Sequence, residues 1–201
     1  MNTFDEMAAR YETPQRVQVA NIIADAMRPH LAGCAGKNGI DYGCGTGLVG
    51  LQLAECFGSM LFVDASPPMV ELVKDKIRRM GVHNADALCA DFTEEAPAGL
   101  SADCILMVQV LLHIPDTERI LRQMYGVMNP GGHILIVDFD KNEAARHERV
   151  HNGFVQADLM ELMEGIGYTG AASKTFHQAE QYFMNQDATL FLLDATKPGE
   201  M

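Results

Sequence analysis

The part of the sequence best suited to chemistry is a glycine-rich run at residues 41–47, which reads Asp-Tyr-Gly-Cys-Gly-Thr-Gly. It lies between two apolar stretches, so it is expected to be the turn between a strand and a helix. Glycine tolerates positive φ and lets a ligand approach the backbone, because it has no Cβ atom. A helix expected over 48–57 would point free N–H groups at that ligand. The run is therefore predicted to bind a nucleotide-type cofactor.

The glycines alone fit two kinds of cofactor. Residues 45–50 also spell GxGxxG, the fingerprint of dinucleotide-binding proteins. Asp41 argues against a pyrophosphate at the loop, because like charges repel, and it suits the ammonium group of an amino acid. Asp64 ends the next apolar run and could accept both hydroxyls of a ribose, which does not discriminate between the cofactors. Asp91 and Phe92 follow a third run and could hold the amino group and the ring of an adenine.

Histidines provide the candidates for proton transfer. His113 lies just past the expected fourth strand, where its imidazole could take a proton from a substrate near neutral pH. It could equally bond a neighbouring backbone group. His147 and His151 are four residues apart, a spacing that can bind a metal ion on a helix. We predict no metal there and favour the lining of a substrate pocket.

The five cysteines, by contrast, show no CxxC spacing, and most sit in apolar or glycine-rich stretches. Such residues are typical of reduced, buried side chains. The sequence therefore predicts neither disulfides nor a zinc site.

The elements that would position these residues alternate between short apolar runs and amphipathic stretches, as in a parallel α/β sheet. Strands are expected at 39–42, 60–64, 86–90, 104–108 and 133–139. Helices are expected to begin near Pro14, Ser66, Asp116 and Val155. Two more strands, at 173–178 and 189–193, lack a following helix, so we expect them to form an antiparallel hairpin at the edge of the sheet.

Composition limits the function. The chain has 201 residues, 48% of them apolar, and a formal charge of −12, which is ordinary for one globular domain but repels nucleic acid. No apolar run reaches the roughly 20 residues that cross a membrane. The acidic amino terminus is unlike a secretory signal, so a cytoplasmic location is expected. The basic residues at 74–79 are interpreted as the solvated face of a helix.

Five ordered segments resemble the class I S-adenosylmethionine-dependent methyltransferases, in particular the small ubiquinone/menaquinone-biosynthesis-like group. They are the amino-terminal start at 4–11, the glycine loop at 41–47, the second-strand motif at 62–69, the segment at 108–116 and the turn at 128–133. Two positions depart from that pattern. Glu12 replaces an aspartate, and Leu112 stands where a second histidine is common, which leaves His113 as the sole imidazole there.

The resemblance implies a single doubly wound, Rossmann-like α/β domain with a seven-stranded, mostly parallel sheet and an antiparallel last strand. We expect one domain over 1–201, with a helical cap at 1–35 and the core at 36–201. The implied cofactor is S-adenosylmethionine, with S-adenosylhomocysteine as its product. The predicted cofactor-binding residues are Tyr11, Asp41, Gly43, Cys44, Gly45, Gly47, Asp64, Ala65, Met69, Asp91, Phe92 and Gln109, with Arg10 as an alternative to Tyr11.

We expect a small-molecule acceptor above the fourth and fifth strands, under a lid formed by 1–35 and 140–155. His113 is the candidate catalytic residue. The chain is expected to act as a monomer or homodimer. Two alternatives stay open at this point: a nicotinamide-dependent oxidoreductase, and a protein that binds the cofactor without catalysis.

Overall fold

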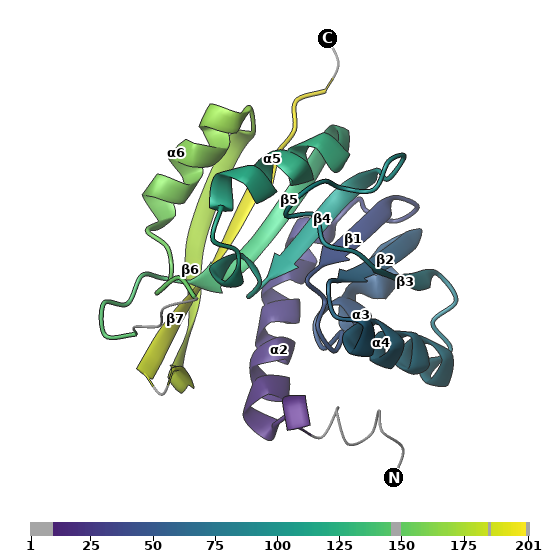
Figure 1. Cartoon of the computed structure of the whole chain (residues 1–201), viewed down its shortest axis with the longest axis horizontal. Coiled ribbons are helices and arrows are strands. Elements are labelled where there is room, and N and C mark those ends of the chain that lie inside the picture. The colour runs from purple at the N-terminus through teal and green to yellow at the C-terminus, as the bar shows by residue number, and fades with distance from the viewer. Residues whose placement is uncertain (1–9, 146–149, 185, 200–201) are drawn as a thin grey trace.

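The computed structural model describes residues 10–145, 150–184 and 186–199, and it contains a seven-stranded sheet in the order β3-β2-β1-β4-β5-β7-β6 (Figure 1). The first five strands pair in parallel, whereas β7 is inserted antiparallel between β5 and β6. This confirms the predicted fold class. The strands are β1 Asn38–Tyr42, β2 Ser59–Asp64, β3 Ala85–Cys89, β4 Ala102–Val108, β5 Met128–Phe139, β6 Thr169–Phe183 and β7 Gln186–Thr196.

Helices cover both faces of the sheet, and this is why its central strands are apolar along almost their whole length. The first layer comprises α2 Pro14–Met27, α3 Gly50–Leu53 and α4 Pro67–Met80. The second comprises α5 Thr117–Val127 and α6 Gln156–Ile166. Strand residues alternate between the two layers: in β4, Leu106 packs in the first and Ile105 in the second.

The predicted helix starts are confirmed, but at one of them the expected residue does not make the capping hydrogen bond. The Thr13 hydroxyl accepts a hydrogen bond from the Arg16 amide, and the Asp116 carboxylate accepts one from Arg119, so both residues cap their helices. At Ser66 the side chain makes no capping bond. The Asp64 carboxylate instead accepts a hydrogen bond from the Ser66 amide at 2.8 Å.

The expectation of a helix over 48–57 was wrong. The chain there forms only the four-residue α3 and a short 3-10 turn, η2 Ala54–Cys56. Gly50, at the start of α3, approaches the end of β1 so closely that a Cβ atom there would lie 2.1 Å from Oδ2 of Asp41. A helix this short supplies no substantial dipole, so the loop itself must position any ligand.

The hairpin at the sheet edge is confirmed, but its strands are longer than predicted. β6 is mostly exposed, and its polar residues hide the apolar alternation that marks a strand. Backbone pairing with the buried β7 holds it in place. Among the residues described, no helix is both long and apolar enough to cross a membrane. Residues 4–9 of the amino-terminal motif and His147 lie outside the described part of the chain.

Candidate functional site

A cavity of about 840 Å³ lies where β1, β2, β4 and β5 end. β1 and β4 are neighbours in the sheet, with β2 and β3 on one side and β5 on the other. The strand order therefore reverses at this point, which is where open α/β sheets bind ligands. One wall consists of Asp41, Gly43, Cys44, Gly45, Thr46, Leu48, Val49, Asp64, Ser66 and Met69. We call this wall the cofactor side.

The glycine loop folds back onto the end of β2. The amides of Gly43 and Cys44 donate to the Val63 carbonyl at 2.8 and 3.0 Å. Gly43, Gly45 and Gly47 have φ of 70°, 53° and 76°, which is the left-handed region that favours glycine. A Cβ atom on Gly43 would lie 2.2 Å from Cγ2 of Val110, whereas one on Gly45 would meet nothing within 4 Å. Gly45 therefore leaves open space at the cavity wall.

Asp41 brings a buried carboxyl group to the cavity. The residue is 3% exposed, and its carboxyl group makes no hydrogen bond to another described residue. Burial, and next the charge of Asp64, raise the pKa of Asp41 to about 7. A cation beside this carboxyl group would favour its ionised form. Asp41 is thus suited to a ligand that carries a positive charge.

Asp64 is held by the backbone on both sides. Its Oδ2 accepts a hydrogen bond from the Gly45 amide at 2.9 Å, and its Oδ1 accepts one from the Ser66 amide at 2.8 Å. A carboxylate oxygen can accept a second hydrogen bond, so Asp64 retains capacity toward the cavity. The carboxylate is fixed in direction before any ligand arrives.

Gln109 has a strained backbone, with φ of 53° although it is not a glycine, and it shares this feature with Met184 in the cavity lining. Its Oε1 accepts a hydrogen bond from the Tyr182 hydroxyl at 3.3 Å. Its Nε2 is buried and has no partner among the described residues. Strained residues and unpaired polar atoms concentrate at ligand sites, and this amide can donate to a bound molecule.

Lys76 corrects the interpretation of the basic cluster as a solvated face. The side chains of Lys74, Arg78 and Arg79 are 41–71% exposed, but that of Lys76 is only 19% exposed. It forms an ion pair with Glu12 and donates to the Thr46 carbonyl at 2.7 Å. Lys76 therefore ties the segment before α2 to the glycine loop.

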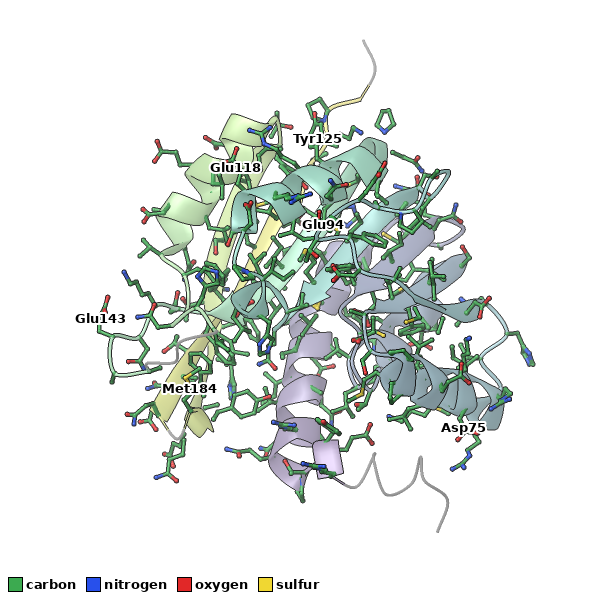
Figure 2. The ribbon with its side chains drawn as sticks, viewed as in Figure 1. Asp75, Glu94, Glu118, Tyr125, Glu143 and Met184 are labelled. Atoms are coloured by element: carbon green, nitrogen blue, oxygen red, sulfur yellow. The ribbon has the colours of Figure 1, made fainter. Side chains whose placement is uncertain are left out.

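The opposite wall is mainly apolar, and we call it the acceptor side. The Phe139 and Phe183 rings stack with centroids 4.4 Å apart, and Tyr182 lies 6.0 Å from Phe139. Met184, labelled in Figure 2, lies at the tip of the β6–β7 hairpin. The other residues of this wall are Tyr11, Arg16, Ala20, Ile23, Val108, Gln109, Val110, Leu112, His113 and Val150.

Sequence reasoning missed the hairpin's contribution to the acceptor side. The apolar triplet at 182–184, set among polar residues, was the available signal. The Gln15 side chain donates to the Glu180 carbonyl at 3.0 Å, so α2 and the hairpin meet above the cavity. The predicted lid segments do contribute, through Tyr11 and through Val150.

His113 lines the cavity from a 3-10 turn, η3 Leu111–His113. The turn is anchored by Asp138, whose Oδ2 accepts a hydrogen bond from the Leu112 amide at 3.1 Å. Asp138 is fully buried, and burial raises its pKa to about 7. His151 is not part of the lining, and its Nε2 lies 3.0 Å from the carbonyl oxygen of Ile114.

The structure brings Tyr11, Asp41, Gly43, Cys44, Gly45, Asp64, Met69, Gln109 and His113 together around the cavity. The predicted residues Gly47, Ala65, Asp91 and Phe92 are not in its lining. Phe92 is fully buried against Tyr42, with ring centroids 4.9 Å apart. Asp91 is exposed and accepts a hydrogen bond from the Thr93 amide at 2.9 Å, which closes a turn. Their contacts with adenine stay a prediction.

Comparison with known proteins gives a family match over most of the chain. A family model described as "Methyltransferase domain" matches residues 18–182. The ubiquinone/menaquinone biosynthesis C-methyltransferase of Haemophilus ducreyi is 28% identical over 142 residues, which are 69% of this chain and 54% of that protein. The chain spans about half the length of the curated relatives it matches.

Solved structures agree on the fold. The [4+2]-cyclase SpnF has a TM-score of 0.73 at 20% identity, covering 91% of this chain and 82% of that one. A SAM-dependent methyltransferase from Aquifex aeolicus has a TM-score of 0.70 at 16% identity, covering 98% and 99%. Both likenesses support the Rossmann-like fold described above.

Proposed function

The chain belongs to the methyltransferase-domain family, for which S-adenosylmethionine is the cofactor, and from this premise we propose that it transfers a methyl group to a small acceptor molecule. The observation that carries the proposal is a single cavity with two different walls. The cofactor side supplies carboxylates and a glycine loop, and the acceptor side supplies stacked aromatic rings. A volume of about 840 Å³ lies within the range of small-molecule sites.

The residues of the cofactor side fit S-adenosylmethionine. Asp41 offers the ammonium group a buried carboxyl group that makes no hydrogen bond to another described residue, and Asp64 offers the ribose hydroxyls a fixed carboxylate. Gly45 leaves room beside the loop. From the acceptor side, the buried Nε2 of Gln109 has no acceptor among the described residues and could donate to the cofactor. When bound, the cofactor supplies a methyl group that its positively charged sulfur has already activated.

The acceptor side favours a molecule with an apolar or aromatic body. Phe139, Tyr182 and Phe183 present ring surface, and Met184 adds an adaptable thioether. Several relatives are named for ubiquinone or menaquinone biosynthesis, which supports an aromatic acceptor for this chain too. Because the wall closes through α2 and the hairpin, we propose a small acceptor rather than a macromolecule.

The protein's task in such a transfer is to align the acceptor and exclude water. The hydrogen bond between Tyr182 and Gln109 joins the hairpin to the end of β4 within the acceptor side and so helps to hold that wall in place. Where the attacking group carries a proton, we propose that His113 accepts it, because His113 lines the cavity on a turn anchored by Asp138.

The test has a binding step and a turnover step. Calorimetry should show binding of S-adenosylmethionine and S-adenosylhomocysteine by the folded protein, and no comparable binding of NADH. Methyl-labelled S-adenosylmethionine should then label small hydroxyaromatic compounds, and neither a protein mixture nor an RNA mixture. A well-folded protein that binds no S-adenosylmethionine would contradict the whole proposal.

A second candidate is supported by the fold shared with SpnF, a protein named as a cyclase rather than a methyltransferase. It is a protein that binds the cofactor and transfers no methyl group. The same assay separates the two: binding without label in any acceptor favours the second candidate, and label in a hydroxyaromatic compound excludes it.

A further inference from the structure

A cluster of cysteine and histidine side chains lies at the end of the sheet opposite to the cavity. Cys104 near the start of β4 is the register partner of His133 in β5, so their side chains project from the same face. Cys34 comes from the chain between η1 (Arg28–Leu31) and β1, and it packs in the same core layer as Cys104. Segments up to 99 residues apart in the sequence thus converge on one point.

The cluster has the geometry of a metal site. The two Sγ atoms and a ring nitrogen of His133 all lie within 4.8 Å of one another. A zinc ion with Zn–S bonds of about 2.3 Å and Zn–N bonds of about 2.0 Å places its ligand atoms within roughly 4 Å of each other. Only small rotations of the side chains are needed to bring the three atoms onto one ion.

His133 is prepared for the role of ligand. Its Nε2 is buried and has no partner among the described residues, which is costly unless something binds there. Its ring is hydrogen-bonded to the backbone of His30. Metal-ligating histidines usually use their second ring nitrogen in this way, because that bond fixes the orientation of the ring.

The chemistry of the set selects the ion. Two thiolates and a neutral imidazole match the borderline-soft Zn²⁺ and balance its charge, so the ion could be buried without a net charge. We propose that Cys34, Cys104 and His133 bind one zinc ion, with water in the fourth position. Asp194, bonded to Nδ1 of His30 at 2.8 Å, extends the polar shell around them.

Such an ion would have a structural role. It would tie the chain before β1 to β4 and β5, and so fix α2, whose Ala20 and Ile23 line the cavity. The site is separate from the cofactor side, so zinc binding should not need S-adenosylmethionine. This inference therefore stands or falls independently of the proposed methyl transfer.

The test uses the reduced full-length protein, freed of metal and titrated with Zn²⁺ and with Co²⁺ as a spectroscopic probe. We expect one ion per chain and thiolate-to-cobalt charge-transfer absorption. Cys34→Ser and His133→Gln should each weaken zinc binding by at least about tenfold. The matched control is Cys89→Ser, because Cys89 is exposed and lies outside the cluster, and it should bind zinc as the wild type does.

Several outcomes would overturn the proposal. One is a cobalt spectrum of the wild type without thiolate absorption. Another is an equal loss of zinc binding in Cys89→Ser. A third is a Cys34–Cys104 disulfide that forms in air, together with a reduced protein that does not bind zinc. The wild-type spectrum decides the matter even where a variant folds poorly, and the melting temperature should rise with added Zn²⁺ in the wild type but not in Cys34→Ser.

Discussion

The two walls of the cavity are built in different ways. The glycine loop, Asp64 and Met69 of the cofactor side lie within residues 41–69, one continuous stretch of chain. The acceptor side draws on residues near 11–23, 108–113, 139, 150 and 182–184, which are brought together only by the finished sheet. The first wall is a local structure with fixed backbone geometry, and the second depends on long-range packing. Changes to each should therefore have separable effects.

The largest effect is expected from Gly43→Ala on the cofactor side. The added Cβ would lie 2.2 Å from Val110, at a φ of 70° that alanine disfavours. Strain and overpacking each cost about 1–3 kcal/mol, so affinity for S-adenosylhomocysteine should fall by about 100-fold or more in calorimetry. Gly126→Ala is the control, because its Cβ would meet nothing within 4 Å. Equal affinities in the two variants would contradict the rigid-loop interpretation.

Asp41→Asn should have the next largest effect. It keeps the shape of the side chain but removes the charge offered to the cofactor, so affinity should fall by about 10- to 100-fold, or about 1.4–2.8 kcal/mol. The KM for the acceptor should change little. Below a pH of about 7 the wild type should also bind the cofactor more weakly, since its Asp41 is then protonated. If Asp41→Asn left the affinity unchanged, the ammonium group of the cofactor would not lie beside Asp41.

On the acceptor side, Phe183→Leu should weaken binding of the acceptor and leave binding of the cofactor nearly unchanged. It preserves an apolar side chain but removes the ring stacked on Phe139 at 4.4 Å. Lost pocket contacts of this size are worth about 1–3 kcal/mol, so the KM for an aromatic acceptor should rise roughly tenfold. Affinity for S-adenosylhomocysteine should stay within about twofold. Phe57→Leu, a buried position outside the cavity, controls for general loosening of the core. If Phe183→Leu weakened the binding of S-adenosylhomocysteine as much as that of the acceptor, the effects of the two walls would not be separable.

The smallest effect concerns stability against pH. Burial raises the pKa values of Asp41 and Asp138 to about 7, well above the value of 3.8 expected in the unfolded chain. The folded state therefore holds more protons between these values, and its stability should fall as pH rises through about 7. In urea unfolding of the ligand-free protein, each of these two carboxyl groups should lower the free energy of unfolding by about 1 kcal/mol between pH 6 and pH 8. Asp41→Asn should reduce the dependence of the free energy of unfolding on pH. An unchanged dependence in this variant would contradict the assignment to Asp41.

The same contrast explains what the sequence could predict. The glycine loop and Asp64 were predictable because each follows a strand directly and local spacing fixes its place. The acceptor wall at 182–184 was not, because the exposed β6 shows little apolar periodicity. The cluster of Cys34, Cys104 and His133 was missed because no local spacing links its members, and only the pairing of β4 with β5 unites the last two.

The helix expected after the loop shows a different kind of failure. The apolar residues at 48–57 favoured a helix, but the structure has an α-helix only over Gly50–Leu53, where Gly50 lies too close to Asp41 for a side chain. Asp91 illustrates an ambiguity of residue type, since an aspartate can close a turn or bind a ligand. Here its Oδ1 closes a turn on Thr93, and its contact with adenine stays a prediction.

The insertion of β7 between β5 and β6 has a consequence for how the protein is made. β7 follows every other described strand in the chain, yet it occupies an inner position in the sheet. During synthesis, β5 must present an unpaired apolar edge until β7 leaves the ribosome, and such an edge invites pairing with other chains. The β6–β7 hairpin is local in sequence, so it can form quickly and dock as a unit. Nascent chains that stop before residue 186 should therefore be the species that most needs a chaperone.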